Sequence, residues 1–107
     1  MRNQSEAVSG PAPALHAEAD EALLDRVRAG DETALSTLYR RYVQAIYRFV
    51  LGQVRDHDLA EDLTSDSFAR MLRGLDSFRG EASFKNWLYQ IARNAVLLLE
   101  QIQIDRK

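Results

Sequence analysis

Apolar residues recur every three to four positions along most of this chain, which is the spacing of helices that bury one face. The pattern predicts helices over about residues 20–29, 32–55 and 58–72, and a fourth from residue 84 onward. No segment alternates apolar and polar positions in the way that half-buried strands do. The predicted fold class is therefore all-α, a small bundle of about four helices with short connections.

Start and stop signals agree with these limits. Gly30 suits the end of the first helix, and the side chains of Asp31 and Ser83 can cap the second and the fourth. The turn Asp56-His57-Asp58 offers caps for the third helix, and residues 74–82 are predicted to form a loop. The predicted inner face of the third helix consists of Leu59, Leu63, Phe68, Met71 and Leu72.

The first 19 residues have no apolar period, and Ser9-Gly10-Pro11-Ala12-Pro13 interrupts any regular element. Residues 1–19 are therefore predicted to be a disordered N-terminal segment, and residues 20–107 a single helical domain. No apolar run approaches the roughly 20 residues that cross a bilayer, and the start lacks the apolar stretch of a secretory signal. We expect no membrane insertion and a cytoplasmic location, with which the lack of cysteine agrees.

Catalysis has no candidate residues in this sequence. His16 lies in the predicted disordered segment and His57 in an acidic turn, and neither has a nucleophile or second base at a recognisable spacing. No glycine-rich phosphate loop is present, and a chain without cysteine cannot form a thiolate metal site. The sequence predicts a protein that is not an enzyme, with no catalytic residue, no metal and no cofactor.

Charge is unevenly distributed along the chain, although the net charge is only −2. Residues 20–66 hold six arginines against ten carboxylates, whereas residues 69–93 hold five cations against two carboxylates. This division suggests two different binding faces, and ordinary scatter over a solvated surface explains it equally well.

A stripe of acidic residues follows one side of the predicted third helix, because Asp58, Asp62 and Asp66 are four positions apart. Arg70 continues this stripe and can pair with Asp66. A hard-metal site is disfavoured because no loop wraps around the carboxylates. Two interpretations stay open: a docking face for a basic partner helix, and a solvated helix face with an internal ion pair.

Residues 76–94 combine aromatic rings with cations and amides, as do surfaces that hold unstacked nucleic-acid bases. At about 3.6 residues per turn, one stripe of this helix faces the core. The inward stripe is Phe84, Trp87, Leu88 and Ile91, and the outward set is Arg79, Lys85, Asn86, Tyr89, Gln90 and Arg93. The outward set favours a single strand of nucleic acid over a protein groove. The rings by themselves would serve equally to close the bundle.

Several blocks of residues, taken together, indicate a family. They span residues 23–31, 38–42, 46–49 and 60–64 with Phe68, then Leu-Asp-Ser-Phe-Arg-Gly at 75–80 and Trp-Leu-Tyr-Gln-Ile-Ala-Arg-Asn at 87–94. In this order the chain resembles, over about residues 20–96, the promoter-melting domain of bacterial sigma factors of the extracytoplasmic-function group. The resemblance implies a transcription initiation factor domain that docks on RNA polymerase and recognises and melts the −10 promoter element.

Two sets of site residues are implied by the resemblance. In the family, the third helix and the adjoining part of the second bind the coiled-coil clamp helices of the polymerase β′ subunit. The implied docking residues are Arg41, Asp62, Ser65, Asp66 and Arg70. The loop before the fourth helix, with that helix, binds the non-template strand of promoter DNA and holds a flipped base. The implied DNA-binding residues are Phe78, Arg79, Ser83, Phe84, Lys85, Asn86, Arg93 and Asn94. An anti-sigma factor that covers the same surfaces is a further expected partner.

The chain departs from the family in three respects. Ser65 stands where glutamine is frequent, which weakens the expected docking. Residues 97–104 are mostly apolar where basic residues are expected, so this end either binds less DNA or self-associates through Leu98 and Ile102. The domain that would recognise the −35 element is missing, so we expect either a fragment or a solitary melting domain. The alternative function is a sigma-like protein-interaction module with reduced DNA binding, whose contact stripe is Leu97, Leu98, Leu99 and Ile102.

Overall fold

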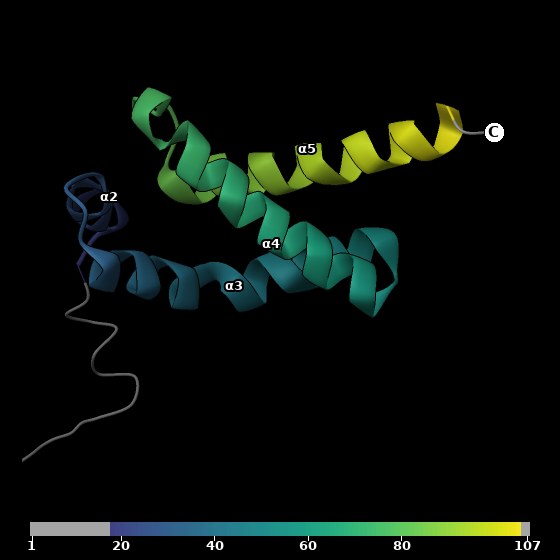
Figure 1. Ribbon diagram of the computed structural model, residues 1–107, viewed down its shortest axis with the longest axis horizontal. Coiled ribbons are helices and arrows are strands. Elements are labelled where there is room, and N and C mark those ends of the chain that lie inside the picture. The colour runs from purple at the N-terminus through teal and green to yellow at the C-terminus, as the bar shows by residue number, and fades with distance from the viewer. Residues whose placement is uncertain (1–17, 106–107) are drawn as a thin grey trace, which may run out of the picture.

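The computed structural model describes residues 18–105, which form four α-helices and one short 3-10 turn (Figure 1). The helices are α2 (Asp20–Arg28), α3 (Glu32–Val54), α4 (His57–Gly74) and α5 (Phe84–Asp105), and the turn η2 (Leu75–Ser77) follows α4 directly. Within residues 18–105 no strand is present, so the all-α prediction is confirmed. Of the predicted disordered segment, residues 1–17 lie outside the described part of the chain.

Side-chain caps begin three of the helices where the sequence predicted them. The Asp31 carboxylate accepts hydrogen bonds from two backbone amides in the first turn of α3, at 2.9 and 3.2 Å. Asp56 caps α4 in the same way at 3.0 Å, and the Ser83 hydroxyl caps α5 at 3.1 Å. The sequence did not predict the backbone conformation that ends α3, where Arg55 is left-handed with φ of 58°. A side chain costs roughly 1–2 kcal/mol there, and the packing of α4 back onto α3 offsets this cost.

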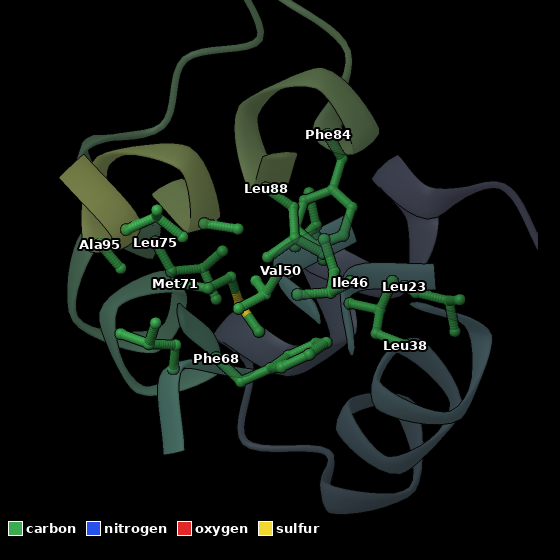
Figure 2. Close-up of a cluster of buried hydrophobic side chains, with 14 of the residues drawn as sticks. Leu23, Leu38, Ile46, Val50, Phe68, Met71, Leu75, Phe84, Leu88 and Ala95 are labelled. Atoms are coloured by element: carbon green, nitrogen blue, oxygen red, sulfur yellow. The ribbon is translucent and has the colours of Figure 1, made fainter. Parts of the chain in front are cut away.

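The four helices surround one core. In Figure 1, α2 lies at the beginning of α3, while α4 runs diagonally from the end of α3 up to the loop that starts α5. α3 packs against all three other helices, and α5 packs against α4, α3 and α2. Figure 2 shows buried side chains from every element converging. They include Leu23 of α2, Leu38, Ile46 and Val50 of α3, Phe68 and Met71 of α4, Leu75 of η2, and Phe84, Leu88 and Ala95 of α5.

The inner face of α4 differs from the prediction in two ways. Leu72 points outward and is 44% exposed, because Met71 beside it occupies the core position and neighbouring residues lie about 100° apart around a helix. Small residues, Ala60 and Ser67, are fully buried instead. The Ser67 hydroxyl donates to the carbonyl of Leu63 at 2.7 Å, so its burial leaves no unsatisfied polar group. Small side chains on this face allow α4 to approach its neighbours closely.

The predicted loop at 74–82 is shorter than expected. α4 extends through Gly74, and Leu75 is buried in η2, so only residues 78–83 connect η2 to α5. A side chain at Gly74 would put its first carbon 3.3 Å from the ring of Trp87, which is tighter than ordinary packing. The indole of Trp87 therefore packs directly over the end of α4.

Candidate nucleic-acid and partner-binding surfaces

Three aromatic rings lie at the junction of the 78–83 loop and the start of α5. The half-buried ring of Phe78 stacks on Trp87, with centroids 4.5 Å apart and planes at 25°. Phe84 meets Phe78 edge-on at 6.4 Å and lies 6.0 Å from Trp87. This cluster fixes the side chain of Phe78 while leaving part of it open to solvent.

Phe84 was among the predicted DNA-binding residues, and the structure corrects its role. Its side chain is 0% exposed and points into the core toward Ile46 and Val50 of α3 (Figure 2). It also meets Tyr42 edge-on at 5.6 Å. Because no part of the ring reaches the surface, Phe84 supports Phe78 and Trp87 from beneath and exposes no ring surface to a strand.

A cavity of about 360 Å³ lies between α2 and the loop. Its lining consists of Glu21, Leu24, Asp25, Arg28, Asp76, Phe78, Arg79 and Gly80. Gly80 has φ of 82°, a conformation that favours glycine, and this residue turns the loop at the cavity wall. The prediction placed a base pocket at this loop but missed the contribution of α2, because nothing in the pattern of α2 indicates a site.

Arg28 joins α2 to the loop across this cavity. Its Nη2 donates hydrogen bonds to the carbonyl oxygens of Leu75 and Phe78, each at 3.0 Å. Its Nη1 lies 3.4 Å from an Asp25 carboxylate oxygen. Basic residues are common in the last turn of a helix because they interact favourably with the helix dipole. The position of Arg28 in the sequence therefore gave no sign that it contacts the loop.

The exposed residues around the loop and the first half of α5 are cationic and polar. Arg79, Ser83, Lys85, Asn86, Arg93 and Asn94 are all exposed. Within residues 18–105 the ion pairs involve only Arg26, Arg28, Arg41 and Arg70, so Arg79, Lys85 and Arg93 are unpaired. The Asn94 side chain accepts a hydrogen bond from Gln90 at 3.2 Å. Tyr89, predicted to face outward, is half-buried and packs edge-on against Phe49 at 5.3 Å.

A second surface lies between α3 and α4, where a groove of about 630 Å³ opens. Its lining consists of Tyr39, Val43, Gln44, Tyr47, Glu61, Asp62, Thr64 and Ser65. The groove therefore brings together two predicted docking residues, Asp62 and Ser65. The buried hydroxyl of Thr64 has no hydrogen-bond partner within the described residues. At its edge the Tyr47 hydroxyl lies 2.6 Å from Nδ1 of His57.

The remaining docking candidates lie apart from the groove lining. Asp66 and Arg70 form the predicted i,i+4 ion pair, at 2.6 Å on a partly exposed part of α4. Arg41 instead pairs with Asp20 of α2 at 2.6 Å, because it lies about 200° around α3 from Tyr39. The same Asp20 carboxylate accepts a hydrogen bond from Tyr42. Burial is the main cause that raises the pKa of Tyr42, and this hydrogen bond is the second.

Metal binding and membrane insertion find no structural candidate among residues 18–105. No three side chains of the metal-binding types His, Cys, Asp and Glu are grouped so that they could hold an ion. In the same part of the chain, every helix is too short or too polar to span a bilayer.

Comparison with known proteins decides the family. Residues 38–98, more than half of the chain, match the family described as Sigma-70 region 2. The chain belongs to this family. Its region 2 segment contains most of α3, all of α4 and η2, the loop, and α5 as far as Leu98, but it does not include α2.

Similar proteins include two sigma factors. The RNA polymerase sigma-H factor of Pseudomonas aeruginosa is 36% identical over 77 residues, which cover 72% of this chain and 40% of the relative. The ECF RNA polymerase sigma-E factor of Escherichia coli (strain K12) is 39% identical over 75 residues, covering 70% and 39%. The chain therefore spans about two fifths of the length of the curated relatives that it matches.

A solved structure of region 2 has the same fold. An engineered region 2 of sigmaE, determined by NMR in complex with GTAAAA, superposes with a TM-score of 0.74 at 32% identity. The match covers 83% of this chain and 93% of that one. The four helices described above are thus the arrangement found in another sigma-70 region 2.

Proposed function

We propose that this sigma-70 region 2 chain docks on the β′ clamp helices of RNA polymerase and binds the melted non-template strand of a −10 promoter element. It acts in the bacterial cytoplasm, without catalysis or a cofactor. The observation that carries the proposal is the cavity at the 78–83 loop, which Arg79 lines, together with the exposed cations Lys85 and Arg93 on the α5 helix that follows the loop. The solved complex of a related region 2 with GTAAAA supports the choice of a short nucleic acid as ligand.

Strand capture follows from the chemistry of this surface. Lys85 and Arg93 hold phosphates, Phe78 offers a ring on which a base stacks, and Asn86 and Asn94 present amides to base edges. Removing a base from the duplex costs a few kcal/mol, and stacking on a side chain returns about 1–3 kcal/mol per base. The domain melts DNA by binding bases after they leave the stack.

Docking on polymerase uses the groove between α3 and α4. Glu61 and Asp62 are both exposed at this groove, where their carboxylates can accept hydrogen bonds from a basic helix. The acidic groove then binds a basic partner, and the cationic loop surface binds an anionic one. The docking interpretation of the acidic stripe is therefore preferred over a merely solvated face.

Removing two phosphate contacts tests the DNA-binding assignment. We expect Lys85→Ala with Arg93→Ala to weaken binding of a labelled single-stranded −10 oligonucleotide. The slope of log K against log salt should fall by about 0.7 for each cation lost. The matched control is Arg40→Ala with Arg48→Ala, which removes the same charge from exposed positions of α3. Fluorescence anisotropy at several salt concentrations measures both, and unchanged binding by the Lys85/Arg93 variant would refute the assignment.

A second candidate function, protein interaction through the end of α5, is favoured by one observation. Leu97, Leu98, Ile102 and Ile104 are between 45% and 65% exposed, which is unusual for neighbouring large apolar side chains. Such a surface suits an anti-sigma factor or a second copy of the chain. We expect light scattering after size exclusion to detect a dimer that dissociates in the Leu98→Gln, Ile102→Gln variant. A monomer at every concentration would exclude self-association and leave the anti-sigma factor as the candidate partner.

A further inference from the structure

The 78–83 loop has few internal bonds to define its shape. Within residues 18–105, the backbone groups of residues 79–82 make no hydrogen bond, and Gly80 adds conformational freedom. The turn before it is closed by the Phe78 amide donating to the carbonyl of Leu75 at 3.3 Å. A loop of this kind needs contacts with other parts of the protein to hold one conformation. If it samples several conformations, binding must select one of them, which adds an entropic cost.

Arg28 supplies the main polar contact of this kind. Its two hydrogen bonds reach the carbonyls of Leu75, the first residue of η2, and of Phe78, the residue that follows η2. The bonded residues are 47 and 50 positions away in the chain. The ion pair with Asp25, three residues earlier on α2, orients the guanidinium toward the loop. Charge-assisted bonds from a planar guanidinium are stronger than neutral ones and have a defined direction.

We infer that Arg28 is a positioning residue for single-strand binding, which makes α2 part of the DNA-binding unit. This inference rests on the proposed function, and it extends the unit beyond the matched segment 38–98. Arg28 acts by holding the loop in the shape that forms the cavity, with Phe78 presented at its wall. Because its Nη2 is committed to two protein carbonyls, the residue contributes to binding without neutralising a phosphate.

Two properties separate this role from simple charge. A lysine at position 28 would keep the charge, but it has one nitrogen on a flexible stem. It lacks the planar group in which Nη2 faces the two carbonyls while Nη1 faces Asp25. A phosphate contact contributes about 0.7 to the salt slope of single-strand binding, whereas a residue that only shapes the loop contributes nothing to it. Affinity and salt slope therefore change independently in the variants.

The free protein offers a separate readout. Trp87 is the single tryptophan of the chain, and its indole stacks on Phe78, the residue whose carbonyl accepts from Arg28. Loosening the loop changes the surroundings of the indole. The emission spectrum of Trp87 and its quenching by acrylamide thus report the anchoring of the loop without any DNA.

The experiment compares Arg28→Gln, Arg28→Lys and the charge-matched control Arg40→Gln on α3. The probe is a pool of labelled single-stranded oligonucleotides randomised over six positions, the length of GTAAAA, from which the strand that the wild type binds best is taken for titration. We expect both Arg28 variants to bind it about tenfold more weakly, with an unchanged salt slope and a shifted Trp87 emission. Arg40→Gln should match the wild type, and circular dichroism should show unchanged helix content in all three.

Three results would overturn the inference. Full affinity of Arg28→Lys together with a shifted Trp87 emission would mean that charge, and not the anchored loop, supports binding. A lower salt slope in Arg28→Gln would mean that the residue contacts a phosphate. Wild-type affinity of Arg28→Gln would mean that the loop needs no anchor. A wild-type protein that binds no strand in the pool would instead refute the proposed function, and the inference with it. Should Arg28→Gln lose helix content, the milder Arg28→Lys variant decides.

Discussion

The groove between α3 and α4 and the surface around the 78–83 loop are built in different ways. The groove is formed by two long helices that pack on one another, and its side chains take their places from helix geometry. The loop surface combines one helix with six residues outside regular structure, and its cavity needs a wall from α2. The surface proposed for docking therefore needs only two helices that are consecutive in the chain, whereas the pocket proposed for a base depends on contacts between distant parts of the chain.

The two surfaces also differ in charge. Glu61 and Asp62 line the groove, whereas Lys85 and Arg93 lie exposed on α5. The uneven charge along the sequence is thus only partly separated in space, because Glu21, Asp25 and Asp76 line the cavity beside the loop. Under the proposed function, one surface binds a basic protein helix and the other an anionic strand, and each can be altered by mutation without the other.

The largest expected effect comes from Phe84, which belongs to the core that both surfaces share. Phe84→Ala should lower the free energy of unfolding by about 3–5 kcal/mol, because it removes a fully buried ring and leaves a cavity. Urea denaturation followed by circular dichroism measures this loss. Strand binding and polymerase binding should decline together. Loss of strand binding alone, with stability retained, would show that Phe84 has a direct role that its burial does not indicate.

Charge reversal in the groove should separate the two surfaces. We expect Asp62→Lys to weaken binding of an immobilised β′ clamp-helix fragment by about tenfold or more, because like charges at an interface cost up to several kcal/mol. Strand binding should stay unchanged. Glu100→Lys on α5 is the matched control, since it reverses one exposed carboxylate outside the groove. Equal losses in both variants, measured by biolayer interferometry, would contradict specific docking at the groove.

The smallest effect is expected at Asp31, which touches neither surface. Arg26 donates to its carboxylate at 2.9 Å, and this bond, followed by the helix-capping amides, holds the pKa of Asp31 below its usual value. A carboxyl group whose pKa is lower in the folded state stabilises the fold at pH values above its unfolded-state pKa. This stabilisation is lost as the pH falls through the folded-state pKa. Asp31→Asn keeps a cap and removes the charge. Its melting temperature should be slightly lower at pH 7 and approach the wild type in acid. A difference independent of pH would argue against the ion pair.

Most of the fold could be predicted because its signals are local. The apolar period located four helices, and the caps Asp31 and Ser83 marked where two of them begin, since both signals act within one or two helical turns. The error at Leu72 has a different origin. Periodicity identifies apolar positions, but packing decides that Met71 is buried and that Ser67 shares its face.

The candidate site was predictable in composition and only partly in arrangement. The exposed cations and amides of α5 follow from helix period alone, and among the predicted residues only Phe84 proved to be sealed inside the core. Arg41 was grouped with the docking residues by resemblance, and its docking role stays a prediction; the structure shows it paired with Asp20. Helix period already places Arg41 on another side of α3 from Tyr39, but its partner Asp20 on α2 is known only once the helices are assembled.

By itself the sequence determined the helices, their caps, the acidic and cationic halves, and the family to which the chain belongs. Tertiary structure alone decided that Arg28 would reach the carbonyls of Leu75 and Phe78, and that α2 would close the cavity beside the loop. The physical reason is distance along the chain. Helix period and capping involve residues a few positions apart, whereas a contact across 47 residues exists only after the core has brought the two segments together.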